Sequence, residues 1–205
     1  MTYPTLAEFR QWAAIDDSYD DDTLTLALDT ASQKVDDHCG RTFTQDAAVT
    51  VRTLRAVDPY RLILEPGMDI STATGLIVKT DDNDDGSYET TWTVVTDFEL
   101  ESSGYGYNGQ AGWPWTQIIA VGSKYWPIYT NRRGVQITAK FGWPAVPAPV
   151  KQATLIMAAE QWKLKDAPFG VAGFGEFGPL RVRDNPMATN LLARYRHPVT
   201  SAVLA

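Results

Sequence analysis

The sequence predicts an α+β fold in which an antiparallel β region is inserted into a small helical bundle. A long amphipathic pattern lies between Asp20 and Arg41, strand and turn residues follow it, and helical periodicity returns after Pro147. We therefore expect a helical core formed by residues 1–43 and 142–197, with an inserted β domain at 44–141.

The N-terminal segment reads as a helical hairpin. Thr5 and Glu8 have capping-box spacing, which predicts a short helix over residues 5–13. One of the aspartates Asp20–Asp22 caps a second helix, and Gly40 is a favoured residue for ending it. The apolar stripe of this helix consists of Leu24, Leu28, Ala31, Val35 and Cys39.

The middle of the chain alternates apolar and polar residues between Gly, Pro, Asp and Asn clusters, which predicts a meandering, mostly antiparallel β region. The expected strands are 47–55, Arg61–Leu64, Gly75–Thr80, Tyr88–Thr96, Phe98–Glu101, Gln117–Val121 and Val135–Phe141.

Two helices are expected near the C-terminus. Pro147 and Pro149 open the first, because proline costs little in a first helical turn. Its apolar residues occupy two faces, so we expect it to be central or to lie between subunits. These faces hold Val150, Ala153, Met157 and Leu164, and Leu155, Ala159 and Trp162. A last helix, Met187–Tyr195, starts after Asn185 and Pro186 and ends before His197 and Pro198.

Composition excludes several classes of protein. Cys39 is the single cysteine and there are two histidines, so neither an internal disulfide nor a Cys/His zinc site is expected. No membrane span or signal peptide is recognisable, which predicts a soluble protein made in the cytoplasm. The net charge of -7 argues against nonspecific DNA binding.

The charge is unevenly distributed along the chain. Residues 1–40 hold nine acids and two bases, whereas residues 150–205 hold four acids and seven bases. An acidic front and a basic back suit head-to-tail association of identical subunits; ordinary solvated charge is the alternative.

One segment matches the first half of a calcium loop. Asp81, Asn83 and Asp85 alternate before Gly86, so their oxygens could converge on a hard cation, with help from Glu89. The twelfth position holds Trp92 where such a loop needs glutamate. A solvated hairpin tip is the alternative, because turns favour the same residues.

A second segment, residues 166–184, is expected to be a flexible Gly/Phe-rich docking loop. Gly173, Gly175 and Gly178 spell a dinucleotide fingerprint, but neither the strand before it nor the helix after it is present. We expect a loop that becomes buried against a partner. Its three aromatic residues are Phe169, Phe174 and Phe177.

Other candidate sites are weaker. His38 and Cys39 point in different directions on a helix, so no catalytic residue is expected and the chain is predicted not to be an enzyme. Trp-Pro pairs at Trp113, Trp126 and Trp143 suggest aromatic platforms for sugars; packing of these tryptophans in β cores and interfaces is the alternative. The alternative function is therefore a ligand-binding β module dependent on metal or carbohydrate.

The two helical ends, residues 3–43 and 139–197, resemble the head-to-tail connector (adaptor, or head-completion) family of tailed bacteriophages. The resemblance rests on the hairpin ending in Cys39, Gly40 and Arg41, the Phe141–Trp143 segment leading through Pro147 into Val150, Ala153 and Ala158, and the closing segment from Asp184 to Arg196. The β insertion resembles the variant in longer connectors.

This resemblance implies a non-enzymatic virion protein of the neck, the head-tail interface, without a cofactor. It implies a homo-oligomeric ring, typically a dodecamer, that docks on the portal after DNA packaging. The next interface protein, a stopper or tail terminator, binds the ring, and DNA passes through the channel without specific binding. Portal and subunit contacts would fall to Leu191, Leu192, Arg194, Tyr195 and Arg196.

Overall fold

The structure, a computed structural model, has the predicted α+β class. It describes residues 3–16, 18–102, 112–163, 171–173, 179–181 and 186–197. The chain divides into two compact units, a helical unit (Met1–Cys39 with Val146–Arg196) and a β unit (Gly40–Ala145 with His197–Ala205).

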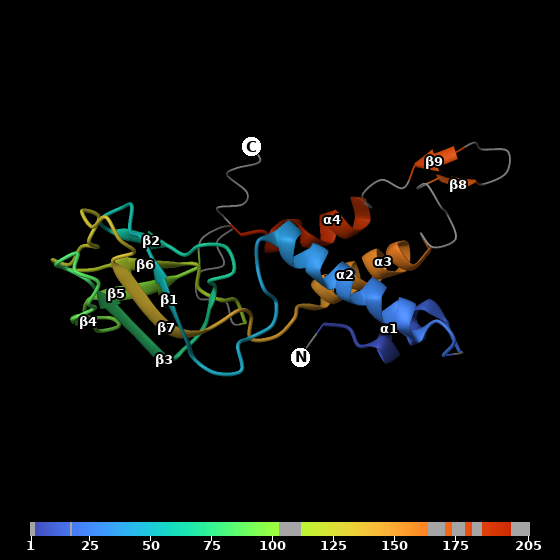
Figure 1. Ribbon diagram of the computed structural model, residues 1–205, viewed down its shortest axis with the longest axis horizontal. Coiled ribbons are helices and arrows are strands. Elements are labelled where there is room, and N and C mark those ends of the chain that lie inside the picture. Colours follow the sequence, from blue (N-terminus) through green and yellow to red (C-terminus); the bar gives the residue numbers. More distant parts are fainter. Residues whose placement is uncertain are drawn as a thin grey trace. The chain divides into compact units, whose positions relative to one another are not determined.

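The helical unit contains α1 (Leu6–Ala13), α2 (Asp21–Cys39), α3 (Ala148–Lys163) and α4 (Pro186–Leu192), followed by a 3-10 turn at Ala193–Tyr195. Helix α3 packs against both α2 and α4, and α1 lies against α2 (Figure 1). Residues far apart in the sequence therefore share one helical core.

Local sequence signals explain α1 and α2. The capping box forms, with the Thr5 hydroxyl accepting from the Glu8 N–H at 3.2 Å and the Glu8 carboxylate accepting from the Thr5 N–H at 2.7 Å. The whole predicted stripe of α2, from Leu24 to Cys39, is buried. Gly40 follows with a φ of 60°, the left-handed conformation that glycine adopts without strain at a helix end.

Helix α3 buries two residues of one predicted face, Val150 and Ala153, and leaves the other predicted face half-buried. Its buried residues are Val150, Ala153, Thr154 and Ala158. The hydroxyl of Thr154 donates to the Val150 carbonyl at 2.9 Å, which satisfies a polar group inside the core. Four other apolar side chains are only half-buried around the core. They are Leu155, Met157, Ala159 and Trp162.

The β unit contains two antiparallel sheets (Figure 1). The four-stranded sheet has the order β1-β7-β3-β4 and the three-stranded sheet the order β2-β6-β5. Their strands are β1 (Thr50–Leu54), β2 (Arg61–Ile63), β3 (Ile70–Thr80), β4 (Thr90–Trp92), β5 (Phe98–Glu101), β6 (Gln117–Ala120) and β7 (Val135–Phe141).

Both sheets contribute to one apolar core. Strand β7 shows the alternation that a sheet with one covered face requires, since Val135, Ile137, Ala139 and Phe141 are buried and the residues between them are half-buried. The β2-β6-β5 sheet supplies Leu62, Phe98 and Ile118 to the same cluster.

Some of the predicted strands have different ends in the structure. Strand β3 begins at Ile70, earlier than predicted, and its pairing with β7 shifts between Ile70 and Ile77. Such a bulge breaks the alternation that sequence reading relies on. Strand β4 is shorter than predicted. Within the expected docking loop, β8 (Val171–Gly173) and β9 (Pro179–Arg181) pair as an antiparallel hairpin.

A buried ion pair lies inside the β unit. The guanidinium of Arg41 is 2.8 Å from the carboxylate of Asp69, and the two side chains are 3% and 0% exposed. The indole N–H of Trp143 donates to the same carboxylate at 3.3 Å. The imidazole of His197 lies 3.7 Å from its other oxygen. One carboxylate therefore serves three partners from distant parts of the chain.

Backbone contacts hold the same place. The Gly142 N–H donates to the Asp69 carbonyl at 2.8 Å. Gly142 has a φ of 93°, and a Cβ on it would lie 1.9 Å from the Thr44 carbonyl oxygen. Only glycine fits there, which explains the Phe141–Gly142–Trp143 motif.

Burial governs the ionisation of this cluster. It raises the pKa of Asp69 above its ordinary value, although Arg41 and Trp143 act in the opposite direction. Burial, with a smaller effect of the Arg41 charge, lowers the pKa of His197 to about 4. His197 is therefore neutral at pH 7.

Among the helices that the structure describes, none is long and apolar enough to cross a membrane.

Replacing Asp69 tests how far folding depends on the ion pair. Asp69→Asn leaves the Arg41 charge buried without a counter-charge, so we expect the free energy of unfolding to fall by about 3–5 kcal/mol. Urea unfolding followed by tryptophan fluorescence measures it. Glu65→Gln is the control. Glu65 pairs with Arg133, but the two side chains are 48% and 56% exposed, so this pair contributes less than about 1 kcal/mol. Equal losses in the two variants would contradict this role.

The lowered pKa of His197 predicts a loss of stability in acid. Between pH 6.5 and about 4 the unfolded chain binds a proton at this position and the folded chain does not. The free energy of unfolding therefore decreases as the pH is lowered, by up to about 1.4 kcal/mol per pH unit. Because the pKa of Asp69 is raised by burial, its protonation has the opposite effect and increases the free energy of unfolding as the pH is lowered.

The His197 contribution is isolated by comparing urea midpoints of the wild type and His197→Gln at several pH values. We expect a shallower slope in the variant than in the wild type, because the variant has no imidazole to protonate at this position. Identical slopes in the two proteins would refute the prediction.

Candidate functional site

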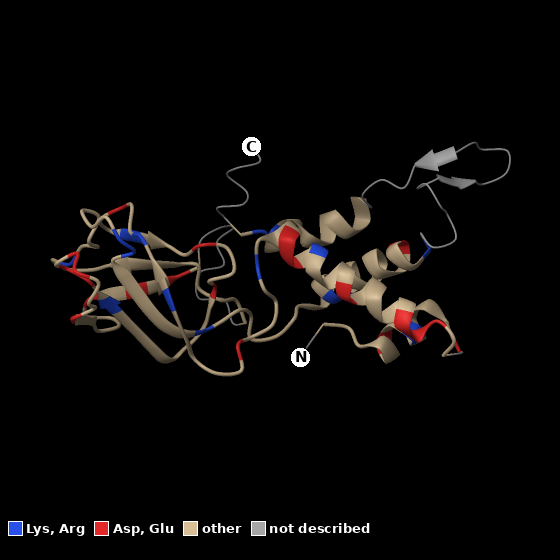
Figure 2. Cartoon of the chain, viewed as in Figure 1, with Lys and Arg blue, Asp and Glu red and all other residues tan. Residues whose placement is uncertain are grey.

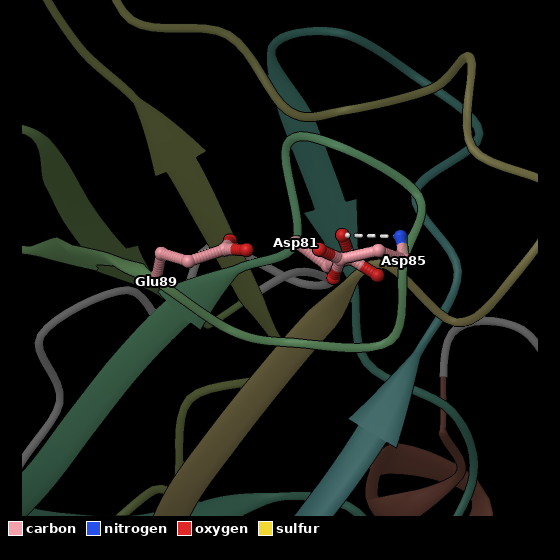
Figure 3. A group of neighbouring side chains, drawn as sticks. All are labelled: Asp81, Asp85 and Glu89. Carbon is pink, nitrogen blue, oxygen red and sulfur yellow. Dashed lines mark hydrogen bonds between the residues drawn. The ribbon is translucent and has the colours of Figure 1, made fainter.

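The predicted calcium segment forms the turn after β3. Ligand oxygens of Asp81, Asp85 and Glu89 lie within 4.8 Å of one another (Figure 3). Asn83 is also present, with its amide donating to the Glu89 carboxylate at 3.4 Å. The structure thus groups two of the predicted ligands with Glu89, and calcium binding there stays a prediction.

Asp81 has a structural task in the same turn. It is fully buried, and its two carboxylate oxygens accept the N–H groups of Asp85 at 3.2 Å and of Gly86 at 2.8 Å. Gly86 has a φ of 95°. The carboxylate therefore holds the chain reversal by itself, as aspartate does in many turns.

The Trp-Pro tryptophans do not form a sugar platform. Trp126 is fully buried and stacks on Trp92 with ring centroids 4.1 Å apart. Trp143 is 1% exposed and packs against Phe43 and Trp113. Faces covered by protein cannot stack on a ligand, so the carbohydrate prediction is wrong for Trp126 and Trp143.

The Asp69–His197 pair resembles half of a catalytic triad, but it lies out of reach of a substrate. Both side chains are fully buried, and the charge of Arg41 opposes the protonated histidine that a general base must become. Cys39 is also buried. These groups support folding.

The predicted portal and subunit contacts fall into two groups. Leu192 and Tyr195 are buried within the helical unit, so their side chains first serve its packing. Leu191 and Arg196 are half-buried and Arg194 is exposed, which leaves these three able to meet a partner. Phe169, Phe174 and Phe177 lie outside the described residues. The interface assignment stays a prediction.

The helical unit exposes apolar side chains that the sequence did not single out. Trp12 is 48% exposed, Leu26 67% and Tyr19 95%. Acidic residues occur at both ends of α2, at Asp21–Asp22 and Asp36–Asp37 (Figure 2). Large exposed apolar groups beside charged ones are typical of surfaces that bind other proteins.

Comparison with protein-family models and with curated proteins gives no match. Among solved structures, the chain is similar to one described as "Neck of empty GTA particle computed with C6 symmetry", with a TM-score of 0.55, 20% identity, and coverage of 96% of this chain and 92% of that chain. A chain of "Virion of native gene transfer agent (GTA) particle" aligns with a TM-score of 0.48 and 19% identity over the same shares. At this identity the first likeness shows a common fold.

The turn role of Asp81 can be separated from ion binding. Asp81→Ala removes the acceptor of two N–H groups, so we expect the free energy of unfolding to fall by about 1–3 kcal/mol in buffer containing a calcium chelator. Chemical denaturation measures the change. An unaltered midpoint would show that the turn does not need the carboxylate.

Calorimetry with calcium then tests the ion on the wild type and on Glu89→Gln, which keeps both Asp81 hydrogen bonds. A saturable heat that Glu89→Gln abolishes would establish the calcium site. A flat titration of the wild type would leave Asp81 as a turn residue alone.

Proposed function

We propose that this chain is a structural protein of the neck of a phage-like particle. The observation that carries the proposal is the fold shared with a chain of the gene transfer agent neck, which extends over 96% of this chain and 92% of that one. That coverage extends over both helical ends of this chain and over its β region.

A structural role also fits the chemistry of the described residues. The groups best suited to catalysis, Cys39 and the Asp69–His197 pair, are buried in packed cores. The carboxylates of the β3–β4 turn accept hydrogen bonds from the Asn83 amide and from backbone N–H groups of the same turn. We propose a non-enzymatic protein on these grounds.

The finer proposal is a head-to-tail adaptor: a ring of identical subunits that joins the capsid portal to the tail. The exposed Trp12 and Leu26 and the half-buried apolar residues around α3 supply surface for contacts between subunits. Twelve subunits agree with the six-fold symmetry used for the related neck, because a twelve-fold ring contains a six-fold axis.

The charge distribution supports such a ring. The acidic residues 1–40 and the basic residues 150–205 supply opposite charges for a heterologous contact, and within the helical unit the two ranges also meet, since Lys151 lies 3.6 Å from Glu8. The net charge of -7 also suits a channel through which DNA slides without adhering, with the aspartates between Asp16 and Asp22 as candidates for its lining.

Electron microscopy of the purified chain mixed with its cognate portal tests the adaptor role. We expect an added ring of density on the portal, in contact with a face that the next neck protein can bind. A chain that stays monomeric and leaves the portal unchanged would overturn the proposal. A monomer without portal would not, because the portal can template the ring.

Arg194 offers a point test of the predicted portal contact. It is exposed, so Arg194→Glu leaves folding nearly intact while reversing a charge at the interface, and we expect about tenfold weaker portal binding. Arg61→Glu, which reverses an exposed charge on β2, is the matched control. Pull-down on immobilised portal measures both, and equal binding of the two variants would remove Arg194 from the interface.

A further inference from the structure

A hollow of about 380 Å³ opens on the surface of the β unit beside β4. Its size falls within the range of small-molecule sites. Three parts of the chain that are distant in sequence form it: the β3–β4 turn, β4 itself, and the loop after β6. The lining residues are Asp82, Thr90, Trp92, Ser123, Lys124, Tyr125 and Tyr129.

Two tyrosines present their rings to solvent here. Tyr125 is 62% exposed and Tyr129 is 60% exposed. The hydroxyl of Tyr129 donates to the Asp82 carbonyl at 3.4 Å, which orients that ring. Beneath them, Trp92 is 6% exposed and is fixed by stacking on Trp126 and by its N–H bond to the Thr80 hydroxyl at 3.0 Å. Flat aromatic surface is thus held in place at the hollow.

The remaining lining side chains are all hydrogen-bonding groups. The Asp82 carboxylate accepts the Thr90 hydroxyl at 2.6 Å, which aims the carboxylate along β4. The ammonium of Lys124 lies 3.7 Å from Asp97 and 5.6 Å from the centre of the Trp92 ring. One carboxylate and one ammonium line the hollow, with the Asp97 carboxylate beside Lys124, and no aliphatic side chain contributes to the lining.

This composition selects among ligand classes. An apolar ligand would leave the hydroxyl, carboxylate and ammonium groups without partners, which is costly. A cation could stack on the tyrosines, but the Lys124 ammonium already lies over Trp92 and, paired with Asp97 at 3.7 Å, competes with it for the negative charge near the hollow. An anion meets the Asp82 carboxylate. A neutral ligand with both donors and acceptors meets none of these penalties.

We infer that the hollow binds a neutral saccharide ring. The C–H face of a sugar stacks on an exposed tyrosine, while its hydroxyls donate to Asp82 and accept from Lys124 and Ser123. Two of the three tryptophans that suggested sugar binding in the sequence, Trp126 and Trp143, are buried, and Tyr125 and Tyr129 near Trp126 take that role. This inference is independent of the neck function and uses residues of the β unit alone.

Saturation-transfer difference NMR on the full chain tests the inference. The probes are glucose, galactose, N-acetylglucosamine and rhamnose at millimolar concentration, with N-acetyl-arginine methylamide as a cationic probe for a partner's arginine. The variants are the double substitution Tyr125→Ala with Tyr129→Ala, the single Tyr125→Ala, and the control Tyr60→Ala, which removes a tyrosine that is 63% exposed and lies outside the lining.

We expect at least one sugar to receive saturation from the wild type and from Tyr60→Ala. Tyr125→Ala weakens its binding, and the double substitution weakens it by about tenfold or more, because the stacking surface is lost. Far-UV circular dichroism confirms that each variant is folded. If the double variant does not fold, the result for the single variant Tyr125→Ala decides the test.

Three results would overturn the inference. The first is no transfer to any of the sugars from the folded wild type. The second is transfer that the tyrosine substitutions leave unchanged, since the sugar then binds elsewhere. The third is transfer to the arginine probe alone, which would make the hollow a socket for a cationic side chain of another protein.

Discussion

The buried carboxylate of Asp69 is the interaction on which the ends of the β unit depend. The chain passes between the two units after Cys39, before Val146 and after Arg196. Next to each passage lies one partner of this carboxylate: Arg41, Trp143 and His197. Removing charges from water is expensive, so the arrangement is stable only while all its members stay in place. An insertion between two helices needs its ends close together, and this cluster brings them together.

Sequence reading succeeded where the determinants are local. The capping box at Thr5, the α2 stripe and Gly40 each act within one or two helical turns, and the structure places α1 and α2 accordingly. At α3 the prediction was right only for Val150 and Ala153, because apolar residues surround that helix and the neighbouring helices decide which face is covered. It also missed the bulge in β3, where pairing with β7 overrides the alternation.

The candidate sites were also predictable only where their determinants are local. The spacing of the residues identified the Asp81–Gly86 turn. Backbone geometry, which the spacing does not give, decides whether Asp81 binds an ion or accepts the N–H groups of its own turn. Trp126 and Tyr125 are neighbours in sequence, yet one is buried and the other 62% exposed, and no local pattern distinguishes them. The Asp69 cluster could not be predicted from local patterns either, because Trp143 is 74 positions from the carboxylate that accepts its N–H.

Charge and exposed apolar surface act in opposite directions on assembly, and together they explain why a template would be needed. Each subunit carries a net charge of -7, so bringing many copies together costs electrostatic free energy even when individual contacts pair acidic and basic surfaces. The exposed Trp12 and Leu26 favour association through apolar burial. A partner that supplies further contacts to every subunit tips this balance. In the proposed neck protein, such a balance would keep free subunits soluble and confine the proposed ring to the completed head.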